Sequence, residues 1–422
     1  GWLLTAVTAL IICMAYFVIK RAAPLFERLQ KFLDRMNVVI RENITGVRVV
    51  RAFNKEKYEE KRMRGVFGSY RDVSVKVNRL FAGLESTALM VINLVIVAIL
   101  FIGGNRTGMG YMEIGDITAL SEYAILILFY LIMAQMVMIT LPRSLVCVER
   151  IREVLEKEPE INDPETEDET EDSHGEDVIR FDNVSFRFSD ADENTLDGIT
   201  FGCKKGRTTA IIGSTGSGKS TITKLALRFH DVTGGAILLN GKDIRKLRQE
   251  SLRDRIAYVP QKAWLFSGTI ADNLRYGNKN ASEDDMWNAL DTAQADFVRG
   301  LSDGLDAVVA QGGTNFSGGQ KQRLSIARAL MKKSDLYIFD DSFSALDFKT
   351  DAALRNALKA KLKDGAVLII AQRISTIVNA DNIIVLENGK IAGMGTHTEL
   401  MESCLVYRDI ARSQMKGDER FG

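Results

Sequence analysis

The sequence predicts a helical transmembrane region followed by an α/β domain. Three stretches without a charged residue predict the first part, at 1–19, 86–105 and 123–142. The second part is predicted by residues 208–229, where an apolar run of strand length leads into a glycine-rich loop and then a helical stretch.

The uncharged stretches are long enough to cross a bilayer. An α-helix rises 1.5 Å per residue, so about 20 residues span the roughly 30 Å of hydrocarbon. A buried helix in a soluble protein is the alternative, but such helices are mostly shorter and keep a polar stripe. We predict spans at about 1–19, 81–105 and 117–142.

The loop charges predict the orientation of these spans. Residues 20–79 hold 16 Lys and Arg, whereas residues 105–116 hold only Arg106. By the positive-inside rule, segment 20–80 and everything after the third span are cytoplasmic. Apolar residues at helical spacing in 20–80 predict that the spans continue as long cytoplasmic helices. Gly46 marks a break or turn there.

The chain begins inside an apolar run, without an initiator Met. A secretory signal is disfavoured because no basic segment precedes this run and Lys20-Arg21 follows it. We expect the true N-terminus to lie upstream, and an odd number of spans agrees with that expectation.

The net charge of zero, from 55 basic and 55 acidic residues, hides three unlike segments. Residues 1–152 carry 20 basic and 12 acidic groups, 153–177 carry 1 and 13, and 178–422 carry 34 and 30. The middle segment predicts an acidic linker at 158–177, in which residues 163–177 form a solvated, extended tether. No dominant basic face exists, which argues against a nucleic-acid partner. The four Cys have no paired spacing, which argues against a disulfide framework or a cysteine zinc site.

The glycine-rich loop carries the pattern of a phosphate-binding loop. Residues 208–212 read as a buried strand, residues 213–220 match G-x-x-x-x-G-K-[ST], and Ile222–Phe229 read as a helix. Backbone N–H groups and a helix N-terminus in such a loop hold phosphates, the Lys reaches the β- and γ-phosphates, and the Ser hydroxyl ligates Mg²⁺. The predicted ATP-binding residues are Gly213, Ser214, Thr215, Gly216, Ser217, Gly218, Lys219, Ser220 and Thr221.

A second apolar strand, at 336–339, ends in Asp340 and Asp341. A carboxylate at the end of such a strand suits Mg²⁺, so Asp340 is predicted as a metal ligand together with Ser220. The next residue, Asp341, would then lie beside the water that attacks the γ-phosphate.

Between these two motifs, Phe316-Ser317-Gly318-Gly319-Gln320 resembles the LSGGQ signature of ATP-binding cassette (ABC) proteins. Further family motifs occur in order. Phe188 resembles the aromatic that stacks on adenine, Gln261 resembles the Q-loop residue at the metal and the catalytic centre, and Asp347 lies in a D-loop-like Ser-Ala-Leu-Asp. The resemblance covers 178–413 as a P-loop ABC nucleotide-binding domain and leaves 414–422 as a tail.

The first part resembles the last three of the six spans of an ABC exporter half-transporter, a partial transmembrane domain at 1–157. Residues 41–53 resemble the coupling helix that docks on the partner's cassette. In such dimers, ATP lies between the P-loop of one chain and the signature of the other.

The sequence departs from the family pattern where catalysis takes place. Asp341 stands where the family usually has a catalytic Glu, and Gln372 stands where it has the switch His. Gln311 stands where many exporters carry Glu. These departures predict a weakened site in this chain and a competent signature for the site of its partner.

The resemblance therefore implies an ABC exporter subunit, of the heterodimeric bacterial multidrug type, in the inner membrane. The alternatives are a homodimer with slow hydrolysis and a regulatory ATP-binding subunit. A soluble ABC ATPase is disfavoured by the three spans. The exported molecule would be a small amphipathic compound, a lipid or a peptide.

Overall fold

The computed structural model describes residues 2–166 and 175–418 of the chain. The middle of the predicted linker and the last residues of the predicted tail lie outside the described residues. The chain divides into two compact units, Gly1–Glu158 and Pro159–Gly422.

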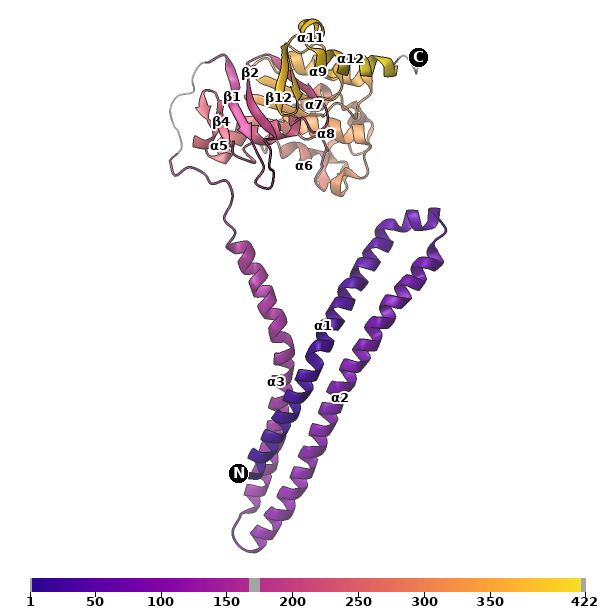
Figure 1. Ribbon diagram of the computed structural model, residues 1–422, viewed down its shortest axis with the longest axis vertical. Coiled ribbons are helices and arrows are strands. Elements are labelled where there is room, and N and C mark those ends of the chain that lie inside the picture. The colour runs from indigo at the N-terminus through magenta and orange to yellow at the C-terminus, as the bar shows by residue number, and fades with distance from the viewer. Residues whose placement is uncertain (1, 167–174, 419–422) are drawn as a thin grey trace. The chain divides into compact units, whose positions relative to one another are not determined.

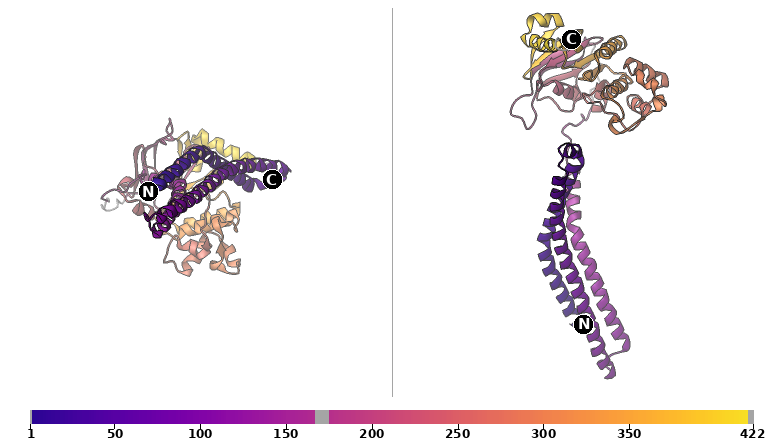
Figure 2. Two further views of the ribbon diagram at one scale, coloured as in Figure 1. Left: turned by 90° about the horizontal axis from the view of Figure 1, so that it is seen from below. Right: turned by 90° about the vertical axis from the view of Figure 1, so that its right-hand side faces the viewer.

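The first unit consists of three long helices that run side by side (Figures 1 and 2). They are α1 (Trp2–Ala52), α2 (Glu56–Gly108) and α3 (Ile114–Leu155). The buried residues of α2 recur at helical spacing and so form one face of the helix. Gly103 on this face packs tightly against Ile117 of α3, because a Cβ atom on Gly103 would be 2.8 Å from Ile117 Cγ1. Other faces expose large apolar side chains such as Leu94, Val97 and Phe101.

Two of these helices, over Thr8–Ala52 and Glu56–Gly108, are long and apolar enough to cross a membrane. The third predicted span, 117–142, is helical within α3, but several of its side chains are outside the described part of the chain. The first two predicted spans continue as long helices, as expected, because α1 and α2 run on as single helices of 51 and 53 residues.

The predicted break at Gly46 is wrong. Helix α1 bends near its C-terminal end (Figure 1) but stays helical to Ala52, and the turn follows at 53–55, where Asn54 has a φ of +50°. A single glycine weakens a helix by only about 1 kcal/mol relative to alanine, which is too little to break a long helix. Asn tolerates the left-handed conformation better than most residues do.

The second unit is built on a six-stranded sheet in the order β12-β11-β3-β10-β9-β6, parallel except for the edge strand β12. Its strands are β12 (Lys390–Gly395), β11 (Asn382–Glu387), β3 (Thr208–Gly213), β10 (Ala366–Ile370), β9 (Leu336–Asp340) and β6 (Ile256–Val259). An antiparallel sheet contains β2 (Leu196–Lys204), β1 (Asp177–Phe186), β4 (Gly234–Leu239) and β5 (Lys242–Asp243). A small ribbon pairs β7 (Gly268–Thr269) with β8 (Val308–Val309).

Alternate residues of the six-stranded sheet enter two different apolar cores. Ile211 and Ile338 belong to the core shared with the antiparallel sheet, whereas Ile212 and Phe339 belong to the core on the opposite face. Side chains alternate along a strand, so a sheet buried on both faces needs the continuous apolar runs seen in the sequence. The strands predicted at 208–212 and 336–339 are confirmed as β3 and β9.

Nine α-helices accompany these sheets within the described residues. They are α4 (Lys219–Ala226), α5 (Gln249–Asp254), α6 (Ile270–Arg275), α7 (Glu283–Thr292), α8 (Gly318–Leu330), α9 (Phe348–Lys361), α10 (Ile374–Ile377), α11 (His397–Ser403) and α12 (Leu405–Asp418). Capping boxes, in which a Ser or Thr and the third helical residue bond each other's backbone, begin α6, α7, α8 and α11. The helix predicted at Ile222–Phe229 begins three residues earlier and ends at Ala226, because Arg228 has a φ of +51°.

The start of the linker is not the fully solvated tether that the sequence predicts. The Oδ1 atom of Asp163 accepts hydrogen bonds from the backbone N and the side-chain Nε2 of Gln249, at 2.9 and 3.1 Å. The buried Arg228 donates to the carbonyl of Asn162 at 3.3 Å. Both contacts attach the linker to the second unit. The ionised carboxylate of Asp163 can accept several hydrogen bonds at once, so it can bind both donors of Gln249.

Arg228 also ties the segment around α5 together, which leads to a stability prediction. Its guanidinium pairs with Asp231 at 3.0 Å and donates to the carbonyls of Ile244 and Leu247 at 3.3 and 3.0 Å. An Arg228→Met variant would leave these carbonyls without their donor at a cost of about 2–3 kcal/mol. We expect thermal denaturation of the second unit to begin roughly 4–12 °C lower. The matched control is Arg245→Met, because Arg245 forms an exposed pair with Asp243 that contributes less than about 1 kcal/mol. Equal melting temperatures for the two variants would contradict the prediction.

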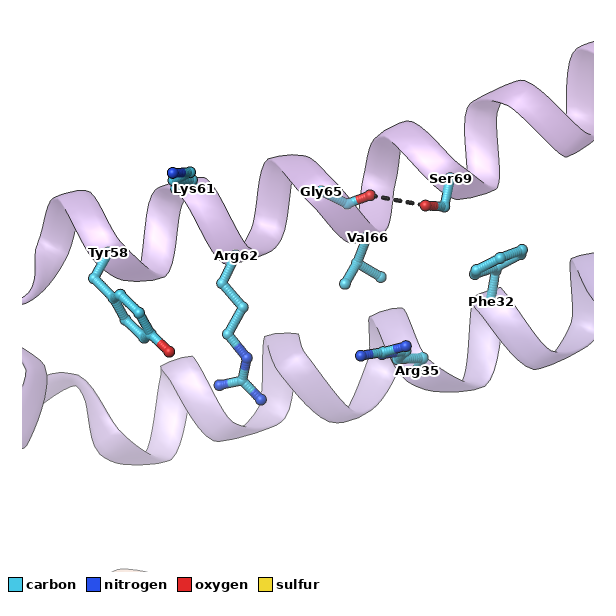
Figure 3. A pocket seen from close by; sticks show the side chains of 8 residues that line it. All are labelled: Phe32, Arg35, Tyr58, Lys61, Arg62, Gly65, Val66 and Ser69. Carbon is cyan, nitrogen blue, oxygen red and sulfur yellow. Dashed lines mark hydrogen bonds between the residues drawn. The ribbon is translucent and has the colours of Figure 1, made fainter.

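A cavity of 510 Å³ lies between α1 and α2 in the first unit (Figure 3). Among its eight lining residues, Phe32 and Arg35 come from α1, and Arg62 extends from α2 toward α1. The guanidinium of Arg62 pairs with Glu42 of α1 at 2.7 Å and with Glu59 at 3.4 Å. These pairs are exposed, so they hold the two helices together only weakly.

Candidate functional site

Four neighbouring strands of the parallel sheet end at one edge, and each leads into a predicted site residue. In sheet order they are β3, β10, β9 and β6. They lead into Gly213, Gln372, Asp340 and Gln261, respectively. The carboxyl ends of parallel strands form a crevice, which is where ligands bind in open α/β sheets. Residues from four separate parts of the sequence therefore meet here.

The loop between β3 and α4 needs its glycines for two different reasons. Gly216 and Gly218 have φ values of +85° and +97°, which other residues rarely adopt. A Cβ atom on Gly213 would lie 2.3 Å from the carbonyl oxygen of Leu386 on β11. Within the loop, Ser214, Thr215 and Ser220 are exposed, whereas Ser217 and Thr221 are buried. One side of the loop is therefore packed against the domain, and its exposed side is open to a ligand.

Lys219, the first residue of α4, lies folded across this loop. Its Nζ donates to the carbonyl oxygens of Gly213 and Ser214, at 2.8 and 2.7 Å. Burial lowers the pKa of Lys219, although Asp341 and Asp340 act in the opposite direction. The ammonium also donates to the Ser217 hydroxyl at 3.5 Å. A buried ammonium held by neutral oxygens alone is well placed to take up anionic oxygens.

Asp340, the predicted metal ligand, ends β9 and is 5% exposed. Its Oδ2 accepts hydrogen bonds from the hydroxyls of Tyr258 and Thr223, at 3.3 and 3.4 Å. Burial raises the pKa of Asp340, and burial together with Asp340 raises the pKa of Tyr258 to about 12. Sequence reasoning missed Thr223 and the role of Tyr258. Thr223 stands three residues after Ser220 on α4, so helical spacing could have placed both on one face.

Asp341 forms hydrogen bonds with both of the amide side chains that were predicted to act with it, Gln261 and Gln372. Its Oδ2 accepts from Nε2 of Gln372 at 2.9 Å and from Nε2 of Gln261 at 3.2 Å. Its backbone has a φ of +46°, and its N–H donates to the carbonyl of Ile370 at 2.8 Å. Burial raises the pKa of Asp341. The three residues predicted as catalytic are thus in direct contact.

The signature residues lie at the start of another helix, α8. The hydroxyl of Ser317 accepts from the N–H of Gln320 at 3.3 Å, and Gln320 Oε1 accepts from the N–H of Ser317 at 2.9 Å. A Cβ atom on Gly319 would lie 3.2 Å from the carbonyl oxygen of Ala345, whereas Gly318 is open. In the described part of the chain, the side-chain hydrogen bonds of Ser317 and Gln320 stay within this capping box. The structure therefore does not bring the signature to the phosphate-binding loop of its own chain.

Two further predicted ligand residues flank the site. Asp347 caps α9, where its carboxylate accepts from the N–H and hydroxyl of Thr350 at 3.0 and 2.8 Å. These hydrogen bonds lower the pKa of Asp347. Phe188 follows β1 and is half-buried, with its ring edge-on to Phe186 at 4.8 Å and to His230 at 5.5 Å. Near the C-terminus, His397 contacts the hydroxyl of the buried Tyr407 at 2.8 Å.

Comparison with known proteins matches both units. Residues 1–132 match the ABC transporter transmembrane region, and residues 196–344 match the ABC transporter family. An ABC transporter ATP-binding protein of Mycobacterium tuberculosis is 42% identical over 418 residues, which cover 98% of this chain and 71% of the relative. The chain belongs to the ABC transporter family. The predicted fold, a helical transmembrane region joined to an α/β ABC nucleotide-binding domain, is confirmed.

The ABC transporter chain also resembles exporters. The ATP-dependent lipid A-core flippase of Pasteurella multocida is 33% identical over 405 residues, covering 94% of this chain and 68% of the flippase. The structure of a bacterial Atm1-family ABC exporter with ATP bound aligns with a TM-score of 0.82 at 29% identity. That alignment covers 98% of this ABC transporter chain and 72% of the exporter chain. The chain is therefore an exporter-type subunit in which a transmembrane region is joined to an ATP-binding domain.

Proposed function

We propose that this chain is one subunit of a heterodimeric ABC exporter and that its own ATP site binds ATP but hydrolyses it slowly. Its signature, Ser317–Gln320, completes the faster site of a different partner subunit. The observation that carries this proposal is the contact of Asp341 with Gln261 and Gln372, where the family resemblance implies a Glu and a His instead.

The side chain of Asp341 is too short for the role that the family gives to Glu. Its side chain is one methylene shorter than that of Glu, so its oxygens fall about one bond length short of the water. The Oδ2 atom already accepts hydrogen bonds from Gln261 and Gln372, and these bonds hold the carboxylate along the edge of the sheet. Burial raises the pKa of this carboxyl, so a lack of basicity is not the reason for slow turnover. We infer that Asp341 is a base of adequate strength in the wrong position.

Gln372 adds a second deficit. Its amide can donate a hydrogen bond to a γ-phosphate oxygen, as the switch His does. It cannot carry the positive charge that a protonated His brings to the transition state, where negative charge spreads over the phosphoryl oxygens. Two deficits at one site favour long ATP occupancy over rapid turnover.

ATP and Mg²⁺ fit the residues that the sheet edge brings together. The exposed loop at 213–221 and Lys219 would hold the phosphates, and Phe188 would stack on the adenine. Ser220, Gln261 and the buried carboxylate of Asp340 form a set of oxygen donors, the kind that Mg²⁺ prefers. When bound, Mg²⁺ would neutralise charge on the β- and γ-phosphates. Gln261 directs its amide nitrogen to Asp341, so its Oε1 is the atom that could reach the metal.

The relatives and the apolar surfaces of the helices support a proposal for the transported molecule and for the membrane. We propose export of a small amphipathic molecule, a lipid or a peptide across a bacterial inner membrane, with the nucleotide-binding domain in the cytoplasm. A lipid is supported by the flippase relative, whose name refers to lipid A-core. The exposed apolar faces of α2 suit contact with the lipid bilayer or with other helices.

Steady-state ATP hydrolysis tests the proposal. The full-length subunit would be measured in lipid nanodiscs, first alone and then with a candidate partner half-transporter. We expect ATP binding with little turnover alone and at least about 10-fold faster hydrolysis with the partner, because the partner supplies an intact base opposite Ser317–Gln320. A partner whose catalytic Glu is replaced by Gln is the control and should give no acceleration.

A homodimer with slow hydrolysis is the second candidate function, favoured by the raised pKa of Asp341, which suits a general base. Turnover by the subunit alone that no partner half-transporter accelerates would establish this candidate and overturn the heterodimer. Binding without turnover, both alone and with every half-transporter that associates with it, would indicate a regulatory subunit.

A further inference from the structure

The loop that carries Gln372 is held from a distance by one side chain of the C-terminal helix α12. Gln414 Nε2 donates to the backbone carbonyl of Gln372 at 2.7 Å, and Gln414 Oε1 accepts from the backbone N–H of Ile374 at 2.8 Å. These contacts join residues 42 and 40 positions apart in the sequence. One amide thus bonds both sides of Arg373 in the loop.

The two hydrogen bonds of Gln414 resemble the pair that a neighbouring β-strand would form with the backbone of Gln372 and Ile374. Beyond the end of β10 at Ile370, Gln372 and Ile374 no longer pair with a neighbouring strand. A side-chain amide has the same donor and acceptor as a peptide group, so Gln414 can replace the missing backbone partner. Two hydrogen bonds to one amide fix direction as well as distance. The backbone at Gln372 is thereby fixed relative to α12.

The other backbone contacts of the loop hold the residues on either side of Gln372: Thr376 N donates to Arg373 O at 3.3 Å, and Val378 N donates to Ile374 O at 3.0 Å. Ala371 N donates to Ile211 O at 3.1 Å, which holds the residue before Gln372 on the sheet. The guanidinium of Arg373 lies over the ring of Phe348 at 5.9 Å, a contact that permits sliding. The side chain of Gln372 then reaches Asp341 Oδ2 at 2.9 Å. A chain of contacts therefore runs from Gln414 through the Gln372 backbone to Asp341.

We infer that Gln414 is a positioning residue for the ATP site of this chain: it holds the Gln372 backbone so that the Gln372 side chain points to Asp341 and the γ-phosphate. The inference rests on the proposed role of Gln372. Helix α12 then acts on the site through the backbone of Gln372. A displacement of α12 would turn Gln372 away and slow hydrolysis while leaving the phosphate-binding loop unchanged.

The test is a double-mutant cycle in the full-length subunit within its assembled transporter. The variants are Gln414→Met, which has a similar shape but no amide, Gln372→Ala, and the double variant. We expect Gln414→Met to lower the rate of single-turnover ATP hydrolysis on the order of 10-fold, measured with a partner whose catalytic Glu is replaced by Gln so that the site of this chain is observed; this is below the 10²-fold that a 1 Å misplacement of a reacting group can cost. The double variant should be no slower than Gln372→Ala alone, because Gln414 acts only through Gln372. The KM for ATP should change by less than about 2-fold.

Three controls separate positioning from general stability. Arg412→Ala changes an exposed residue of the same helix and should leave turnover unaffected. Gln414→Glu keeps the acceptor for Ile374 but sets a carboxylate against the Gln372 carbonyl, so its rate should fall between those of the wild type and Gln414→Met. Hydrogen–deuterium exchange at the Ile374 amide should become faster in Gln414→Met, with the melting temperature unchanged within about 2 °C.

Several results would overturn the inference. They are an unchanged rate in Gln414→Met, a double variant as slow as the product of the two single effects, and wild-type exchange at Ile374. Equal rates in the wild type and Gln372→Ala would also overturn it, because Gln414 would then have no active side chain to position. Failure of the proposed function would look different: the wild-type subunit would then hydrolyse ATP alone at a rate that no partner raises, or ATP would not bind to the phosphate-binding loop at all.

Discussion

Replacing Lys219 with alanine should lower the affinity of the isolated subunit for ATP by about 100-fold or more. The Nζ atom of Lys219 lies over the loop, bonded to two carbonyl oxygens, where phosphate oxygens would replace them. A hydrogen bond to a charged group contributes about 1.5–3 kcal/mol, and two such bonds to phosphate exceed the roughly 2.7 kcal/mol that corresponds to 100-fold. Isothermal titration of ATP into the subunit in nanodiscs measures the change.

The same helix offers a matched control for this substitution. Lys224 is an exposed lysine of α4 with the same charge, and Lys224→Ala should bind ATP within about 2-fold of the wild type. Equal affinities for the Lys219 and Lys224 variants would mean that the loop at 213–221 is not the ATP site. The melting temperature without ATP should be compared as well, since Lys219 also bridges the carbonyls of Gly213 and Ser214.

Restoring the family residues with Asp341→Glu and Gln372→His should raise turnover at the site of this chain by about 10²-fold. The longer Glu reaches the water, and the His supplies a cation at the γ-phosphate. Position 341 has a φ of +46°, so Glu, which adopts this conformation less easily than Asp, would cost about 1–2 kcal/mol of stability. The measurement is single-turnover hydrolysis of ATP by the transporter assembled with a partner whose catalytic Glu is replaced by Gln, so that the site of this chain is observed.

The single variants divide this gain between its two causes. Asp341→Glu alone should give most of the increase, because reach is the larger deficit. Gln372→His alone should give less, since the Asp341 oxygen remains too far from the water. Asp341→Asn, which keeps the shape but removes the base, serves as the negative control. No increase in the double variant would place the defect outside these two residues, for example in the signature of the partner.

The sequence was sufficient to predict those parts of the site that lie next to a strand in the chain. β3, β9 and β10 are apolar runs, and the residues directly after them meet because parallel strands end at a common edge. Because these strands end at a common edge, Asp341 comes into contact with Gln261 and Gln372.

Contacts made by distant side chains could not be predicted in the same way. Gln414 lies on a C-terminal helix whose periodicity gives no sign that one amide bonds a loop 42 residues away. The docking of Asp163 on Gln249 was hidden within an acidic run, where composition indicated only solvent. The helix through Gly46 shows a third limit, because the local preference of one glycine is small compared with the cooperativity of a long helix.

The unbroken course of α1 and α2 has a mechanical consequence. Helices of 51 and 53 residues are about 77 and 80 Å long at 1.5 Å per residue. Helix α1 bends near its C-terminal end, but a rod of the length of α2, pivoted at one end, moves its other end by about 7 Å for a tilt of only 5°. A hinge at Gly46 would absorb such a tilt close to its origin. Continuous helices act as levers, so a small rotation near residues 41–53 becomes a displacement larger than a water molecule at the far end of the transmembrane region.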